Sequence, residues 1–296
     1  MEVDKGNLSL TQPAKKTSPA KQSPVTPPSQ QRSWLSSFWF LGIVVLGGSI
    51  GVIAMITQFD GDSKAELIDY EVIGTYPHDT RAFTQGFVYS DGALFESTGR
   101  YGESSFRKIE IESGKLLHRL DLPANIFAEG LCRWEGEWLQ LTWKAEKILH
   151  YDAQTLEPTR ESTWSRQGWG LTHDGEQLII SDGTSRLFFV DPTNNEIDRS
   201  VDVTEAGSKV DRINELEFIN GFLYANVWYK PYVLKIEPKS GKVVGRLDFT
   251  DQIKAMNLGD RDAVMNGIAY DPKSKHLWLT GKLWPKVFEI KLKEDP

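Results

Sequence analysis

The chain has 296 residues, of which 40% are hydrophobic and 25% charged, and its formal net charge is −7. These proportions are typical of a globular protein with a substantial core, and the acidic balance argues against a nucleic-acid partner. The single cysteine, Cys132, excludes an intrachain disulfide and a metal site built from several cysteines.

Residues 1–33 differ in composition from the rest of the chain. They are rich in Pro, Ser, Gln and Lys and contain little apolar surface to bury, so we expect a disordered tail. The tail has five basic residues against two acidic ones, a net charge of +3, which leaves −10 for the remainder of the chain.

Residues 34–59 contain no charged side chain. The most apolar part, 38–56, is long enough as a helix to cross a hydrocarbon layer of roughly 30 Å. Because positively charged flanks stay in the cytoplasm, the basic tail predicts that the C-terminal part lies on the periplasmic, lumenal or extracellular side. We interpret 34–59 as a single-pass transmembrane signal anchor, with a cleaved signal peptide as the alternative. A linker over 60–69 then leads to the main domain, 70–296.

The main domain contains a repeat. From residue 70 onward, short β-type runs alternate with Gly, Asp, Asn and Pro. Five segments share one plan, in which a polar or aromatic residue and a glycine (once a glutamate) precede two apolar strands joined by a tight turn. The glycine position recurs at 86, 130, 170, 215 and 267, at intervals of 44, 40, 45 and 52 residues. Because these are the lengths of four-stranded propeller blades, the repeat predicts an all-β, five-bladed β-propeller.

The fifth repeat ends after three strands. The segment "YEVIGTYP", Tyr70–Pro77, has the pattern of the missing outer strand. We expect it to complete the last blade, because joining both ends of the domain in one blade leaves no exposed sheet edge.

The first strand of each propeller blade lines the central channel, so equivalent positions should converge there. The residues just before the glycine position are a glutamine, a glutamate, a tryptophan and two asparagines, and the ends of the second strands add a lysine and further tryptophans. The sequence therefore predicts one small cavity with a single carboxylate, several amides, a lysine and indole rings.

The same segments resemble the plant-type glutaminyl cyclases (glutaminyl-peptide cyclotransferases). "AFTQG", "ESTGRYGESS", "NELE", "ANVW", "NGIAYD" and "TGKLWP" stand in the order of that family, and the resemblance spans Tyr70 to about Leu292. It implies a five-bladed propeller that converts the N-terminal glutamine of peptides or proteins to pyroglutamate with release of ammonia. It also implies that no catalytic metal and no other cofactor take part.

Ring closure requires a group that takes a proton from the α-amine and returns it to the departing ammonia. Glu129 is the only carboxylate among the five converging positions and is our candidate acid–base. Candidate hydrogen-bond donors to the oxyanion or the substrate carbonyls are Lys282, Gln85 and Asn214. The candidate substrate-binding residues are Phe83, Trp143, Trp169, Trp228, Asn266 and Trp284.

Two other functions remain open from the residues. A glutamate and several asparagines near the axis could hold a cation, as in a metal-dependent lactonase-like propeller. Alternatively, the domain could be a non-catalytic binding scaffold tethered to a membrane. The five histidines show no metal-ligand spacing, and a letter-for-letter GxSxG match at Gly47–Gly51 lies inside the expected membrane segment.

Overall fold

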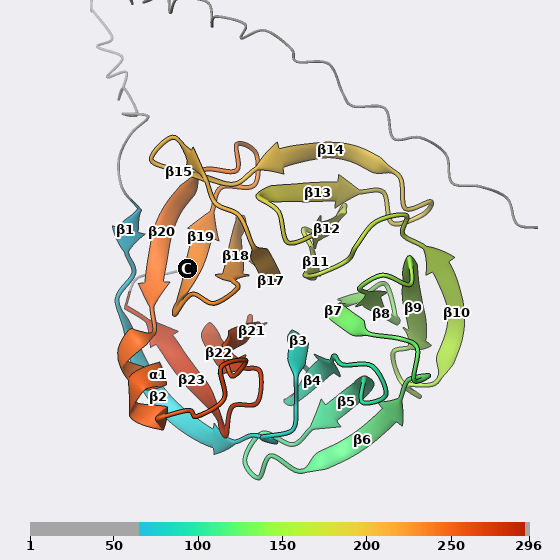
Figure 1. Cartoon of the computed structure of the whole chain (residues 1–296), viewed down its shortest axis with the longest axis horizontal. Helices are drawn as coiled ribbons and strands as arrows, with labels where there is room; N and C mark the ends of the chain where they lie inside the picture. Colours follow the sequence, from blue (N-terminus) through green and yellow to red (C-terminus); the bar gives the residue numbers. More distant parts are fainter. Residues whose placement is uncertain (1–64, 294–296) are drawn as a thin grey trace, which may run out of the picture. The chain divides into compact units, whose positions relative to one another are not determined.

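The computed structural model describes residues 65–293, which form five blades around a central axis (Figure 1). The prediction of an all-β, five-bladed propeller is confirmed. The expected tail and membrane segment lie outside the described residues. Within 65–293, no helix is long and apolar enough to span a membrane.

Three blades consist of four consecutive antiparallel strands, ordered from the axis outward. Blade 1 contains β3 (Thr84–Ser90), β4 (Ala93–Thr98), β5 (Ser105–Ile109) and β6 (Leu116–Asp121). Blade 2 contains β7 (Ala128–Trp134), β8 (Glu137–Thr142), β9 (Lys147–Asp152) and β10 (Pro158–Thr163). Blade 3 contains β11 (Leu171–His173), β12 (Leu178–Ser181), β13 (Arg186–Val190) and β14 (Ile197–Asp202).

The other two blades recruit strands from the start of the domain. Blade 4 contains β17 (Ile213–Ile219), β18 (Phe222–Val227), β19 (Tyr232–Ile236) and β20 (Val243–Asp248), and a short strand, β1 (Glu66–Leu67), pairs with β20 in parallel. Blade 5 contains β21 (Met265–Asp271), β22 (His276–Gly281) and β23 (Lys286–Leu292), and its outer strand is β2 (Tyr70–Pro77). The predicted closure is therefore present, with Tyr70 opposite Leu292 and Pro77 opposite Lys286 (Figure 1).

Short elements occupy the connections between blades. A two-stranded hairpin, β15 (Thr204–Glu205) and β16 (Ser208–Lys209), follows blade 3. A single helix, α1 (Thr250–Met256), joins blade 4 to blade 5, and neither element follows from the repeat pattern.

The turns between first and second strands explain why the repeat folds as hairpins. Asp91–Gly92, Glu135–Gly136 and Asn220–Gly221 each have positive φ at both residues. This is the requirement of a two-residue turn whose twist matches that of the flanking strands, and glycine meets it without strain.

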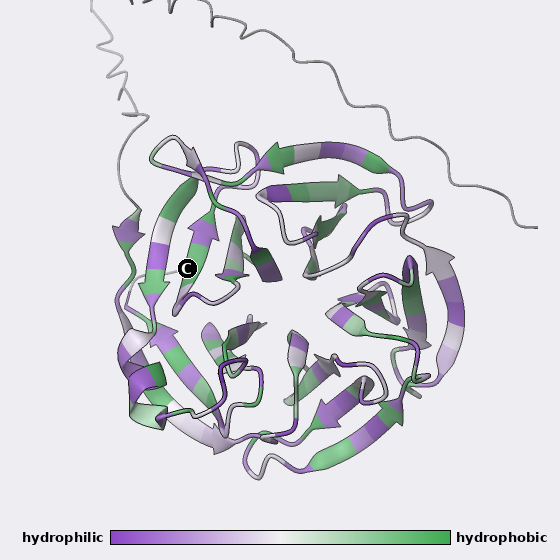
Figure 2. Cartoon of the chain, viewed as in Figure 1, coloured by the Kyte–Doolittle hydropathy of each residue, from purple (hydrophilic) through white to green (hydrophobic). Residues whose placement is uncertain are grey.

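Burial changes from the axis to the rim of each blade. Second strands are buried on both faces, as in β4, because neighbouring blades pack against both sides. Outer strands such as β6 alternate between exposed and partly buried residues, and they carry hydrophilic as well as hydrophobic residues (Figure 2). Large side chains fill the space between blades: the ring of Trp138 in blade 2 stacks 4.1 Å from that of Phe95 in blade 1.

Two features of the inner strands position the candidate site. The strand register shifts near the start of four of them, at Gln85, Glu129, Asn214 and Asn266, and such bulges redirect a side chain. Four of the five converging residues are followed by a glycine. At three of these glycines, Gly86, Gly130 and Gly170, the neighbouring inner strand approaches too closely for a Cβ. A Cβ added at Gly170, for example, would lie 2.0 Å from the backbone oxygen of Asn214.

Candidate active site

Three of the predicted site residues meet at the seam between blades 5 and 1. Lys282 follows β22, and its Nζ donates a 2.5 Å hydrogen bond to Oε1 of Gln85 at the start of β3. Asn266 Nδ2 donates to the backbone oxygen of Thr84 at 2.9 Å and to the same Gln85 oxygen at 3.4 Å. The seam thus carries a cation and two amides in one hydrogen-bonded group.

Glu129 lies on the bulge of β7 and is 4% exposed. Its carboxylate makes no hydrogen bond to any residue of 65–293, although buried polar groups are usually paired. Burial raises the pKa of Glu129 well above its ordinary value, and the nearby positive charge of Lys282 acts in the opposite direction. A buried carboxyl group with a raised pKa holds its proton more readily than an exposed one, which is a property of acid–base catalysts.

Lys282 is the buried cation whose charge acts on Glu129. Burial lowers its pKa to about 8, although the negative charges of Glu129 and Asp262 act to raise it. Its ammonium also lies 4.6 Å from the centroid of the Phe83 ring. Lys282 therefore remains largely protonated at neutral pH while lying in a nearly dry environment.

A continuous aromatic wall extends from Phe83. The rings of Phe83 and Phe127 are 6.3 Å apart edge to face, and Phe127 is 5.6 Å from the ring of Trp143. Trp143 is fixed by a 2.8 Å hydrogen bond from Nε1 to Gln167 Oε1. Phe127 was missed by the sequence analysis because it lies in the connection before β7, outside the repeated positions.

A second aromatic pair is formed by Trp169 and Trp228, whose rings are 5.5 Å apart at 82°. Trp169 precedes β11, and its backbone N–H binds the oxygen of Ser181. Gly183 makes room for the ring, because an added Cβ there would lie 2.6 Å from it. The side chains of Asn214 and Trp169 leave Oδ1 and Nε1 buried without a partner among the described residues, so both atoms are available to a substrate.

Trp284 does not belong to this cage, contrary to our expectation. It is fully buried, its ring is stacked with that of Phe249 and meets that of Phe288 edge to face, and its Nε1 donates to the oxygen of Ala263. Its ring packs against Gly281, where an added Cβ would lie 2.3 Å from it. The indole therefore turns into the core between blades 4 and 5.

A deeper carboxylate, Glu215, stands at the position that glycine occupies in the other blades. Its Oε1 accepts a 3.2 Å hydrogen bond from the backbone N–H of Phe87, and its Oε2 accepts one of 2.9 Å from Ile268. Burial raises its pKa well above the ordinary value. The sequence shows that Glu215 is exceptional, because the other four repeats have glycine at this position. The sequence alone does not indicate which groups Glu215 contacts.

A buried ion pair lies behind the seam. His78 Nε2 is 3.0 Å from Glu96 Oε1, which also accepts a 2.7 Å hydrogen bond from Thr84. Glu96 is thus hydrogen-bonded to Thr84, the residue before Gln85. Burial disfavours the charge on both groups, but the Glu96 charge outweighs it and raises the pKa of His78, and the His78 and Arg107 charges lower the pKa of Glu96.

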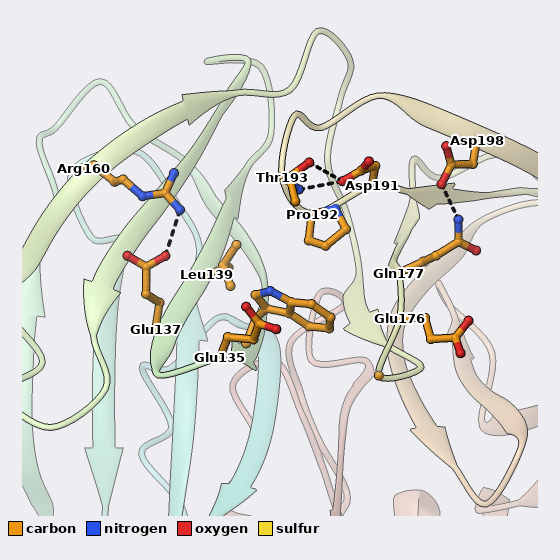
Figure 3. A pocket seen from close by; sticks show the side chains of 12 residues that line it. Glu135, Glu137, Leu139, Arg160, Glu176, Gln177, Asp191, Pro192, Thr193 and Asp198 are labelled. Atoms are coloured by element: carbon orange, nitrogen blue, oxygen red, sulfur yellow. Dashed lines mark hydrogen bonds and ion pairs between the residues drawn. The ribbon is translucent and has the colours of Figure 1, made fainter.

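A hollow of about 810 Å³ lies between blades 2 and 3, at the strand ends opposite to those that carry the candidate site residues (Figure 3). Its lining includes Trp134, five carboxylates and Arg160, and Arg160 pairs with Glu137 at 2.8 Å. None of the predicted site residues lines it. Across residues 65–293, no three His, Cys, Asp or Glu side chains are grouped so that they could hold a metal ion.

Comparison with known proteins identifies relatives over most of the chain. A sequence model described as glutamine cyclotransferase matches residues 45–292. The glutaminyl-peptide cyclotransferase of Arabidopsis thaliana is 35% identical over 280 residues, which cover 90% of this chain and 88% of that protein. The crystal structure of Myxococcus xanthus glutaminyl cyclase aligns with a TM-score of 0.73 at 37% identity, covering 77% of this chain and 98% of the other.

Proposed function

The chain belongs to the glutamine cyclotransferase family and is a glutaminyl-peptide cyclotransferase, and we propose that it closes the N-terminal glutamine of peptides or proteins into pyroglutamate with release of ammonia. The observation that carries the proposed mechanism is Glu129, a buried carboxylate that no described residue binds and whose pKa the Lys282 charge acts to lower. Ring closure is intramolecular, so much of the entropic cost of bringing the reactants together is already met.

Glu129 is the proposed acid–base. The α-amine nitrogen attacks the side-chain carbonyl carbon, and Glu129 takes the proton that this nitrogen loses. The C–N bond of the carboxamide then breaks as Glu129 returns the proton to the leaving nitrogen, which departs as ammonia. The raised pKa of Glu129 supports both steps, because it makes the carboxylate a stronger proton acceptor than an ordinary one while the acid can still donate.

Lys282, Gln85 and Asn214 are the proposed donors to the substrate and to the developing oxyanion. Because Lys282 donates to the oxygen of Gln85, the Gln85 amide is oriented with its nitrogen free to donate elsewhere. Asn214 has a side chain that no described residue binds, in the same register as Gln85 and Glu129. Fixed donors of this kind stabilise charge that develops in the transition state.

The aromatic residues are the proposed walls of the substrate pocket. Phe83 and Trp143 lie on one aromatic run, and Trp169 and Trp228 form another. They would hold the folded-back glutamine side chain and exclude water from it. Asn266 supports Gln85 from the seam.

The test of the function is to incubate the domain with a glutamine-initiated peptide and follow the mass loss of one ammonia. An otherwise identical peptide with an acetylated α-amine is the control, because it lacks the attacking nitrogen. The reaction should survive a chelator. Loss of activity on chelation would favour the metal-dependent lactonase-like alternative, and no turnover at all would favour a binding scaffold.

We also propose that residues 34–59 anchor the enzyme in a membrane with the propeller on the periplasmic, lumenal or extracellular side. The uncharged stretch and the basic tail before it support this. Fractionation of the full chain tests it: the protein should stay with membranes through alkaline washing, and a variant lacking residues 34–59 should not. Recovery of the full chain in the wash would contradict the anchor.

A further inference from the structure

The loop between β4 and β5 holds an arginine, Arg100, in a strained backbone conformation. Arg100 has a φ of +86°, a value that side-chain-bearing residues rarely adopt and that glycine adopts freely. Its backbone oxygen accepts hydrogen bonds from Glu103 N at 3.1 Å and Ser104 Oγ at 2.8 Å. Strained positions of this kind cluster at active sites and ligand clamps, although turn residues such as Glu135 also have positive φ in this fold.

The Arg100 guanidinium faces the same ring as the site lysine. Its Cζ lies 4.5 Å from the centroid of Phe83, and Lys282 Nζ lies 4.6 Å from that centroid. The two cations also repel each other enough to help lower the pKa of Lys282. Arg100 therefore borders the pocket in which the mechanism takes place.

The guanidinium of Arg100 makes no hydrogen bond or ion pair with any residue of 65–293. The other two arginines of blade 1 are paired: Arg107 with Asp79 at 3.2 Å and Arg119 with Asp121 at 2.6 Å. Arg100 thus has, over the Phe83 ring, a planar set of N–H donors that no described residue accepts.

We propose that Arg100 binds a carboxylate on the second residue of the substrate, so that peptides beginning Gln-Glu or Gln-Asp are preferred. The inference rests on the proposed function. The fork of a guanidinium matches a carboxylate, with two parallel hydrogen bonds. Consecutive residues of a peptide lie about 3.8 Å apart, so a first residue held beside Lys282 and Gln85 brings the second within reach of Arg100.

The experiment compares three amidated peptides, Gln-Glu-Ala, Gln-Gln-Ala and Gln-Lys-Ala, which differ only in the second side chain. For the wild-type enzyme we expect kcat/KM to be about tenfold higher for Gln-Glu-Ala than for its neutral isostere, as one charge-assisted hydrogen-bonded pair allows. Gln-Lys-Ala should be the slowest. Because charge attraction is screened, the preference should shrink as salt is added.

Arg100→Gly is the informative variant, since glycine fits a φ of +86° and the loop keeps its conformation. It should process Gln-Glu-Ala and Gln-Gln-Ala at equal rates without losing thermal stability. Arg100→Lys should keep only part of the preference. Arg119→Met, which removes a charge from the outer strand of the same blade, is the matched control and should retain the full preference.

A wild-type enzyme without charge preference, a preference that persists in Arg100→Gly, or an equal loss for all three peptides would overturn the inference while leaving the cyclase activity established. Failure of the wild type to cyclise any of the peptides would instead overturn the proposed function, and the inference with it.

Discussion

The carboxylate of Glu215 accepts a 2.9 Å hydrogen bond from the backbone N–H of Ile268, and so joins the inner strands of blades 4 and 5 at the axis. Its other oxygen binds Phe87 in blade 1. Each of the three joined strands carries one of the site amides within two residues of these contacts. Glu215 therefore sets the spacing of the amides around the cavity.

Glu215→Gln tests this spacing role. The amide nitrogen of glutamine cannot accept the second backbone N–H, so one buried donor loses its partner and the fold should lose about 1–3 kcal/mol. We expect kcat to fall more than KM rises, because displaced donors affect the transition state most. Glu217→Gln, two residues further along β17, is the control and should leave kcat unchanged. Equal kcat values for the two variants would argue against the spacing role.

Replacing Glu129 by glutamine removes the proposed acid–base while keeping its size. Turnover should fall by roughly 10²- to 10⁴-fold, the usual contribution of a positioned proton-transfer group. The melting temperature should hold or rise, because a buried carboxyl group without a hydrogen-bond partner is replaced by a neutral one. Circular dichroism and thermal melting check the fold. Near-normal turnover by a folded Glu129→Gln variant would reject the assignment.

The mechanism predicts a bell-shaped pH dependence of kcat/KM. Activity needs Glu129 ionised and Lys282 protonated, so it should rise as pH passes the raised pKa of Glu129 and fall above the Lys282 pKa of about 8. In Lys282→Met the alkaline limb should disappear and the acid limb move to higher pH, because the charge that lowers the Glu129 pKa is gone. The α-amine of the substrate titrates identically with both enzymes. If the acid limb lies at the same pH in both enzymes, the Lys282 charge does not influence the pKa of Glu129.

The stability of the domain should depend on Glu217 between about pH 5 and pH 8. Burial raises the pKa of this carboxyl to about 8, and Glu215 lies beside it with a pKa that is also raised. Within that window the folded protein holds a proton that the unfolded chain has released, so stability falls as pH increases. In Glu217→Gln we expect the loss between pH 5 and pH 8 to be about 3 kcal/mol smaller. Denaturant melts at the two pH values measure this, and parallel curves for both proteins would contradict the assignment.

Much of this architecture is predictable because the repeat carries it. The glycine register at 86, 130 and 170 reflects inner strands that approach too closely for a Cβ, and the Asp-Gly and Asn-Gly turns reflect backbone angles that few residues adopt. Such local requirements restrict which residue type can occupy a position, so they can be recognised in the sequence. The convergence of Gln85 and Glu129 follows from the same register.

The parts that were missed depend on contacts between distant segments. Trp284 lies two residues after Lys282, yet it turns into the core because Gly281 leaves space for its ring. Arg100 and Phe127 lie in connections whose conformation no repeat fixes. The pairing of β1 with the edge of blade 4 likewise depends on residues far along the chain.

The space that glycine leaves for the aromatic walls gives a last test. Gly183 has a φ of +81°, and an added Cβ would lie 2.6 Å from the ring of Trp169. Gly183→Ala should therefore push the indole from its place against Trp228, and KM should rise about tenfold because a substrate wall has moved, with a smaller change in kcat. Gly175→Ala, at the other end of blade 3, also has a positive φ but meets no atom within 4 Å. It should share the backbone strain of Gly183→Ala, roughly 1 kcal/mol, and keep the KM of the wild type. Since strain is common to both variants, only the displacement of Trp169 separates them, and an equal KM in the two would show that this ring does not contact the substrate.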